Sequence, residues 1–153
     1  MPSLLFFAPC EKVLIDQNNT ASMIAVMEEL TVQMIAGVAV PAGAVIPMQW
    51  SVLSMWEQSS AWDKDRGFEQ RTALVSPEGK ILVEVVAPFT FDKDRFRVIN
   101  QFVGMPVGET GLHKIKIWIR DVSDPPKEWR EVGAFPLQIA LKIAPPEVPP
   151  KLN

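Results

Sequence analysis

The stretch GLHKIKIWIR, residues 111–120, indicates the fold class of this chain most clearly. Two kinds of residue alternate along it, as they do in a β-strand, where successive side chains point to opposite faces. One face carries three isoleucines and the only histidine of the chain: His113, Ile115, Ile117 and Ile119. The other face carries three cations and a tryptophan: Lys114, Lys116, Trp118 and Arg120. The stretch therefore predicts a strand that buries one face, with His113 at the head of that face.

The same alternation recurs in residues 46–57, 80–91, 95–102 and 135–143. In the first of these segments the predicted inward face holds Ile46, Met48, Trp50, Val52 and Trp56. In the next two it holds Ile81, Val83, Val85, Phe89, Phe91, Phe96, Val98 and Phe102. In the last it holds Phe135, Leu137, Ile139, Leu141 and Ile143. Between these segments the sequence SPEGK at 76–80 predicts a tight reversal that pairs its flanking strands as a hairpin.

Residues 22–36 fit two structures. Good helix formers and the spacing of Met23, Met27, Leu30 and Met34 favour a helix. The neighbouring segments read as strands, and no regular alternation of helices with strands occurs along the chain. We therefore predict a strand here, while a long helix would make the fold α+β.

Seven or eight strands separated by turns predict an all-β fold, an antiparallel β-sandwich. A chain of 153 residues has the size of one domain. We expect a single sandwich domain over residues 1–144 and a proline-rich, extended tail over residues 145–153.

Five blocks of the sequence resemble the successive blocks of a small bacterial domain family of unknown function. They are FFAPCEKVLIDQNNTASMIAVMEEL, IPMQWSVLSMW, SPEGK, GETGLHKIKIWI and WREVGAFPLQI. The resemblance extends over nearly the whole chain up to Ile143, and its motifs are patterns of strands and turns. It implies an immunoglobulin-like sandwich and no particular activity.

The composition excludes several classes of function. A formal net charge of −3 gives no basic surplus for binding nucleic acid or an anionic membrane. The single Cys10 rules out a disulfide within the chain and a multi-cysteine zinc site. No apolar run reaches the roughly 18 residues that a membrane helix needs. We therefore expect a cytoplasmic protein without a cofactor.

Neither His113 nor Cys10 lies in a recognisable catalytic motif. A general base needs a partner, and the sequence offers His113 neither a nucleophile elbow nor a second metal ligand. We expect the histidine ring to bond a backbone group where its strand begins. Cys10 lies in an apolar strand, where a small buried side chain is more common than a nucleophile. The chain is therefore predicted not to be an enzyme.

Aspartates gather in two similar loops, WDKDRGF at 62–68 and FDKDRF at 91–96. If successive strands alternate in direction, connections 16–21, 58–67, 92–94 and 121–128 emerge at one end of the sandwich. All seven aspartates fall at this end or at its edge: Asp16, Asp63, Asp65, Asp92, Asp94, Asp121 and Asp124. Three tryptophans, Trp56, Trp62 and Trp129, lie near the same end. The predicted binding surface consists of Trp62, Asp63, Asp65, Asp92, Asp94 and Trp129.

Three interpretations compete for this end. Carboxylates in paired loops suit calcium, although each DKDR sequence brings its own lysine and arginine and so nearly neutralises itself. Exposed tryptophans beside aspartates suit stacking against a carbohydrate. Solvated turn residues in weak ion pairs are the simplest interpretation, and the same loops would then be free to contact another protein.

Two further surfaces leave alternatives open. Trp118 among cations is either a sticky patch for an acidic partner or is covered by the stems of its cationic neighbours. The sequence IAGVAVPAGAVIP at 35–47 either folds over the core or forms an interface. We predict a non-catalytic binding or scaffolding module whose partner is a protein, with homo-oligomerisation possible. The alternative is a ligand-, carbohydrate- or calcium-binding module that uses the aspartate and tryptophan end.

Overall fold

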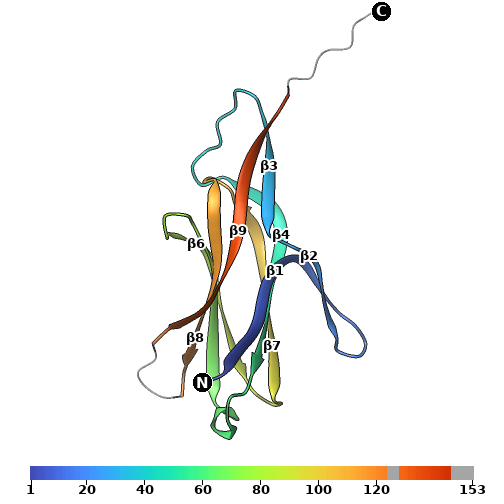
Figure 1. Cartoon of the computed structure of the whole chain (residues 1–153), viewed down its shortest axis with the longest axis vertical. Coiled ribbons are helices and arrows are strands. Elements are labelled where there is room, and N and C mark those ends of the chain that lie inside the picture. Colours follow the sequence, from blue (N-terminus) through green and yellow to red (C-terminus); the bar gives the residue numbers. More distant parts are fainter. Residues whose placement is uncertain (124–127, 146–153) are drawn as a thin grey trace, which may run out of the picture.

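The computed structural model describes residues 1–123 and 128–145, which form two β-sheets packed face to face (Figure 1). The strands are β1 (Ser3–Ile15), β2 (Ala21–Val26), β3 (Glu29–Ile35), β4 (Val45–Glu57), β5 (Gly67–Val75), β6 (Ile81–Thr90), β7 (Arg95–Pro106), β8 (Gly111–Asp121) and β9 (Arg130–Ala144). A short 3₁₀-helix, η1 (Ala61–Asp63), lies between β4 and β5. None of the described residues belongs to a helix that could cross a membrane. The predicted all-β sandwich is confirmed, with nine strands in place of seven or eight.

Most neighbouring strands are antiparallel, as predicted. The first sheet has the order β2-β1-β4-β7, and the second has the order β3-β9-β8-β5-β6. The exception is β3, which pairs with β9 in parallel, from Glu29 opposite Gln138 to Ile35 opposite Ala144. The prediction of a purely antiparallel sandwich is therefore wrong at this edge. Parallel neighbours need a long connection, and the five strands between β3 and β9 in the chain provide it.

Residues 22–36 are extended, but they form two strands rather than one. Ala25 has a φ of 53°, a left-handed conformation that interrupts a regular strand. The N–H of Met27 then donates to the carbonyl of Pro9 in the first sheet, at 2.9 Å, and the carbonyl of Glu28 accepts from Gln138 N–H in the second, at 3.0 Å. The chain therefore passes from one sheet to the other at Met27, whose side chain is buried.

The hairpin predicted at SPEGK is confirmed. The N–H of Ser76 donates to the carbonyl of Lys80 at 2.8 Å, and Gly79, with a φ of +87°, takes the left-handed position that the turn requires. A shift in register places Val75 opposite Ile81 but Leu74 opposite Val83. Ile81 is consequently 39% exposed, so its predicted place on the inward face is wrong.

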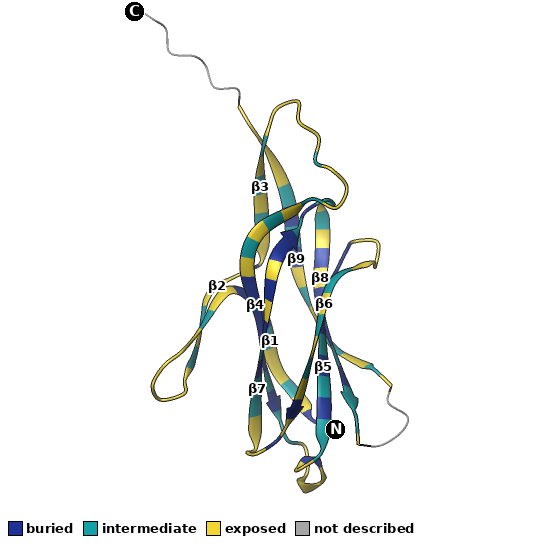
Figure 2. Ribbon diagram, turned by 180° about the vertical axis from the view of Figure 1, so that it is seen from behind, coloured by how far each residue is buried: buried dark blue, intermediate teal, exposed yellow. Residues whose placement is uncertain are grey.

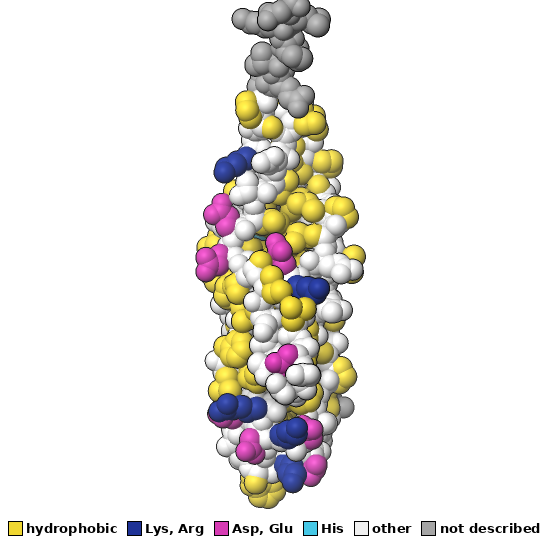
Figure 3. Space-filling view, turned by 90° about the vertical axis from the view of Figure 1, so that its right-hand side faces the viewer, with side chains coloured by type: hydrophobic (Ala, Val, Ile, Leu, Met, Phe, Trp, Pro, Cys, Tyr) yellow, Lys and Arg dark blue, Asp and Glu magenta, His cyan; other side chains and the backbone are white. Residues whose placement is uncertain are grey.

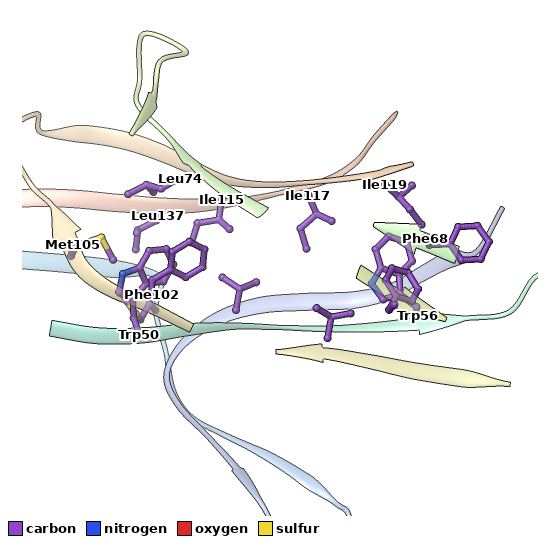
Figure 4. Close-up of a cluster of buried hydrophobic side chains, with 14 of the residues drawn as sticks. Trp50, Trp56, Phe68, Leu74, Phe102, Met105, Ile115, Ile117, Ile119 and Leu137 are labelled. Atoms are coloured by element: carbon purple, nitrogen blue, oxygen red, sulfur yellow. The ribbon is translucent and has the colours of Figure 1, made fainter. Parts of the chain in front are cut away.

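The core includes the inward faces that alternation predicted in β4, β7 and β8, to which β5, β6 and β9 add Phe68, Leu74, Phe89, Leu137 and Ile139. Trp50 stacks on Phe102, with ring centroids 4.2 Å apart, at one end of the core. Trp56 and Phe68 lie at its other end, and the isoleucines of β8 line the layer between them (Figure 4). Because both sheets contribute large buried side chains, the hydrophobic effect holds the two layers together.

A buried polar cluster lies between the sheets, centred on Gln70. Its Oε1 accepts hydrogen bonds from Ser54 Oγ and from Trp56 Nε1, both at 2.7 Å. Its Nε2 donates to Thr72 Oγ1 at 2.8 Å and to Asn100 Oδ1 at 2.9 Å. Every hydrogen-bonding group of the Gln70 side chain thus has a partner, as a buried amide requires.

The two ends of the sandwich differ in how far they are buried. Beyond Ile139, which lies opposite the first residue of β8, strand β9 continues with β3 as its only partner. Leu141 and Ile143 in this extension are 37% and 72% exposed, so their predicted place on the inward face is wrong. Figure 2 shows the exposed residues of β3 and of the end of β9 above the buried core. The predicted tail beyond residue 145 lies outside the described residues.

Candidate functional site

The candidate binding surface is the loop end, which we define as residues 58–66, 91–94 and 121–123. The N–H of Gln58 donates to the carbonyl of Asp94 at 2.8 Å, and Lys64 forms a β-bridge with Phe91. On the other side Arg66 pairs with Asp121 at 2.6 Å. Of the four connections predicted at this end, the structure therefore brings 58–66, 91–94 and the described start of 121–128 together, and Asp124 lies outside the described residues.

The connection 58–66 has a well-defined backbone. The carboxylate Oδ2 of Asp63 accepts from the N–H of Ser59 at 3.0 Å, and the Asp63 N–H donates to the carbonyl of Ser60, also at 3.0 Å. Gln58 Nε2 donates to the same carbonyl at 2.8 Å, and the hydroxyl of Ser59 bonds that of Ser3 in β1 at 2.8 Å. These bonds fix η1 against the end of the first sheet.

Asp63 stabilises this connection from inside. The residue is only 3% exposed, and its Oδ1 lies 3.2 Å from the N-terminal ammonium group of Met1. The oxygens of a carboxylate that is buried, paired and hydrogen-bonded already have partners within the protein, so they are not available to a ligand. The expectation that Asp63 belongs to the exposed binding surface is not met. The counter-charge of Asp63 is the main-chain amine of Met1. Sequence motifs consist of side chains, so they give no sign of this partner.

The other predicted aspartates are exposed, but they do not converge. Asp65, with a φ of 63°, lies in the left-handed conformation that aspartate tolerates in turns, and Asp92 and Asp94 flank Lys93. Among the described residues no three His, Cys, Asp or Glu side chains are placed to hold one metal ion. This arrangement gives no support to the calcium interpretation, because calcium wants six or more oxygen ligands.

The tryptophans of this region differ sharply in exposure. Trp62 on η1 is 81% exposed. Trp129 is half-buried, and the guanidinium of Arg120 lies 4.4 Å from its ring centroid, held there by a hydrogen bond to Glu69 at 2.6 Å. Of these two tryptophans, Trp62 is therefore the one whose ring is largely uncovered.

Trp118 is covered in the same way as Trp129. The Arg71 guanidinium lies 5.2 Å from the ring centroid of Trp118, and the Lys116 ammonium lies 5.9 Å from it. These cations in turn pair with Glu84 and Glu131. Cationic side chains therefore cover Trp118, as one interpretation expected, but only Lys116 comes from the same strand, because Arg71 belongs to β5 and Arg120 lies over Trp129.

Two shallow hollows flank the loop end. One, of about 470 Å³, is lined by Glu57, Gln58, Ser59, Ser60, Ala61 and Asp94. The other, of about 280 Å³, is lined by Asn19, Met55, Asp92, Lys93, Arg95, Phe96 and Arg97. Arg97 donates to the side chain of Asn19 at 2.7 Å, which brings the turn after β1 to this side of the molecule. Asp16 itself caps that turn by accepting from the N–H groups of Asn18 and Thr20.

His113 and Cys10 are both fully buried. Nδ1 of His113 lies 3.1 Å from the carbonyl of Gly111, so the expected bond to the backbone at the strand entry is confirmed. Desolvation by burial raises the pKa of the Cys10 thiol, although a hydrogen bond with the backbone of Lys12 opposes this effect. A thiol that is buried and protonated is a poor nucleophile. The expectation of a small buried side chain at Cys10 is confirmed.

Comparisons with known proteins add no family to these observations. No protein-family model and no curated protein matches the sequence. The resemblance to a bacterial domain family therefore stays an expectation, and the site has to be interpreted from its own geometry.

Proposed function

We propose that the chain is a non-catalytic binding module that docks a protein partner through the loop end. The observation that carries this proposal is the 81% exposure of Trp62 on a connection whose backbone is hydrogen-bonded on both sides. Tryptophan is the side chain most enriched among the residues that dominate binding energy at protein interfaces. Because the loop is already ordered, binding through it loses little conformational entropy.

The charges around Trp62 fit the rim of such an interface. Lys64, Asp65, Asp92, Lys93 and Asp94 are all exposed and place both signs of charge beside the tryptophan. An apolar anchor within a polar, water-accessible rim is the usual anatomy of a non-obligate interface. Charges of mixed sign select among partners and orient them more than they add affinity.

A second candidate function is carbohydrate binding by the same end. The hollow of about 470 Å³ is lined by hydroxyl, amide and carboxylate side chains and includes Ala61, the neighbour of Trp62. Sugars bind to proteins by stacking on an aromatic ring while polar groups bond their hydroxyls. The two candidates share Trp62 and differ in their ligand, so one set of variants tests both.

Three further elements of the proposal rest on the sequence and on burial. The burial of His113 and Cys10 supports a module without catalysis, because neither side chain is accessible to a substrate. A single thiol fits a reducing compartment, which supports a cytoplasmic location. The two packed sheets also fit the immunoglobulin-like architecture that the sequence resemblance implies.

Photo-cross-linking tests the proposed function. A photoreactive phenylalanine analogue replaces Trp62 in one variant and Val86, which is 44% exposed on β6, in a matched control. We expect a discrete protein adduct from position 62 in the host cell and none from position 86. Identical adducts from both positions would contradict a specific loop-end surface. A change in tryptophan fluorescence with oligosaccharides, and with no protein adduct, would favour the second candidate.

A further inference from the structure

The end of the molecule opposite the loop end carries an unsupported two-stranded ribbon. We define the ribbon as residues 31–35 of β3 and 140–144 of β9, the part in which these strands pair only with each other. Parallel pairs are less stable than antiparallel ones and are normally covered on both faces. Two strands alone are marginally stable in water. This ribbon is thus a structure that an additional strand would complete.

One face of the ribbon is apolar, because Val32 and Met34 lie opposite Leu141 and Ile143, whereas the other face carries Thr31, Gln33 and Lys142 and ends at Ile35. Ile35 and Ile143 are 75% and 72% exposed. A hollow of about 460 Å³, lined by Met34, Leu141, Ile143 and residues 37–40, separates the ribbon from the connection to β4. Figure 3 shows one side of the molecule. Hydrophobic side chains are most frequent toward the ribbon, in the upper half, and most Lys and Arg side chains lie toward the loop end, in the lower half. The exposed apolar surface indicates that something covers this end.

The outer edge of β3 differs from the other three sheet edges in lacking protection. Edge strand β6 contains Pro88 and Glu84, and edge strand β7 contains two arginines and ends at Pro106. Strand β2 is short and is distorted at Ala25. Strand β3 has no proline, glycine, lysine or arginine, and its only charge is Glu29 at its first residue. Proteins protect exposed edges with these devices, and an edge without them is open to pairing.

The outer edge of β3 is also open in space. Among the described strands β9 is the only one with extensive contact to β3. Figures 1 and 2 both show the upper part of β3 without a neighbour on the side that faces away from β9. Alternate N–H and C=O groups of this strand are therefore available to a further strand.

We propose that a second copy of this chain occupies the edge, by antiparallel pairing of β3 with β3 about a two-fold axis at Val32. In this register Leu30 lies opposite Met34, and Thr31 lies opposite Gln33. Residues opposite each other share a face, so in these central positions apolar residues meet apolar ones and polar residues meet polar ones, while each end pair places Glu29 opposite Ile35. The result is four adjacent strands in place of two, which satisfies the minimum for a stable sheet.

The charges fit this symmetric pairing. Glu29 of each copy lies opposite Ile35 of the other, at opposite ends of the seven-residue strand, so the two glutamates stay apart. Lys142 of β9 lies opposite Gln33 of β3, and its side chain is on the same face of the sheet as that of Glu29. The pairing brings Lys142 of each copy toward Glu29 of the other. A two-fold contact of this kind closes on itself and ends at a dimer.

Sedimentation velocity over a wide range of protein concentration tests the proposal. We expect the wild-type protein to convert reversibly from monomer to dimer as the concentration rises. Thr31→Lys places like charges diagonally across the new pair while changing only an exposed side chain, so it weakens the dimer and leaves the fold intact. The matched control is Thr90→Lys, at an exposed position of the edge strand β6, which dimerises like the wild type. Trp62→Ala also dimerises normally, because the loop end takes no part.

Oxidative cross-linking tests the register. The two-fold axis brings two Val32→Cys side chains face to face, so this variant forms a covalent dimer, whereas Ile24→Cys on β2 does not. Cys10 is buried and does not compete. The proposal is overturned by a wild-type protein that stays monomeric at all concentrations, by a Thr31→Lys variant that dimerises as strongly as the wild type, or by equal cross-linking at both positions. A monomer that instead binds an added extended peptide at β3 also overturns it and assigns the edge to a different partner.

Discussion

Trp62 and Asp63 are neighbours in the chain and lie at opposite extremes of exposure, at 81% and 3%. The buried carboxylate bonds the backbone of Ser59 and faces the amine of Met1, while the indole points into solvent. The aspartate thus fixes the loop that presents the tryptophan. This relationship divides the predicted binding surface into a structural residue and a contact residue.

Asp63→Asn is expected to destabilise the protein, because the neutral amide loses its charge-assisted bonds to Ser59 and Met1. Hydrogen bonds to charged groups contribute about 1.5–3 kcal/mol and neutral ones about 0.5–1.5 kcal/mol, so we expect a loss of about 1 kcal/mol in the free energy of unfolding. Urea denaturation measures it. Asp65→Asn is the matched control, since Asp65 is exposed and asparagine tolerates its left-handed backbone. Equal stabilities for the two variants would show that Asp63 has no structural role.

Gln70→Leu tests the buried polar cluster with nearly unchanged side-chain volume. The leucine leaves the indole N–H of Trp56 without its acceptor at 2.7 Å and removes the donor to Asn100. Each buried polar group without a partner costs about 1–3 kcal/mol, so the free energy of unfolding should fall by at least about 2 kcal/mol. Gln101→Leu, on the exposed face of β7, should change it by less than about 0.5 kcal/mol. A Gln70→Leu protein as stable as the wild type would mean that the cluster does not contribute to stability.

Because the pKa of the Cys10 thiol is raised, we expect the free energy of unfolding to fall at alkaline pH. Burial raises the pKa of its thiol in the folded protein above the ordinary value of 9.0. Above that value the unfolded chain releases the thiol proton while the folded chain keeps it. The contribution of the protonated thiol to the free energy of unfolding is therefore fully present below pH 9.0 and is lost as the pH rises toward the raised pKa. The slope approaches about 1.4 kcal/mol per pH unit between the two values.

The difference between the wild type and Cys10→Ala isolates this effect, because both proteins share every other titrating group. Denaturation midpoints across the alkaline range should converge, with the wild type losing stability faster than the variant. Parallel profiles for the two proteins would contradict the raised pKa of the Cys10 thiol.

Alternation predicted most strands of the core, because a strand with one buried face has an apolar residue at every second position. Strand β5 was predicted only as the hairpin partner of the strand after SPEGK. His113 and the isoleucines after it are an example of the alternation, and all four are fully buried. The same rule failed at Leu141 and Ile143. Their alternation continues that of Ile139, but beyond Ile139 strand β9 has only β3 beside it, and both side chains are exposed. A periodic pattern records which side chains share a face and does not record what lies opposite that face.

The passage of the chain from one sheet to the other at Met27 could not be predicted from the sequence either. Neither glycine nor proline marks the break between the two strands. Ala25 takes a left-handed conformation there, which is uncommon for alanine and could not be predicted from the sequence. At the loop end, chain direction sufficed to bring the three connections together. The exposure of each side chain depended on long-range partners, such as Arg120 over Trp129 and the Met1 amine beside Asp63.

The affinity of the cross-linked partner for Trp62→Ala decides whether the loop end is the binding surface. Isothermal titration calorimetry should show binding weakened by about 2 kcal/mol or more, roughly thirtyfold, as for a dominant interface tryptophan. Val103→Ala, a truncation of a side chain that is 80% exposed on β7, should bind like the wild type. Both variants should unfold within about 0.5 kcal/mol of the wild type, because neither side chain is buried. An affinity of Trp62→Ala equal to that of the wild type would contradict the proposed role of the loop end.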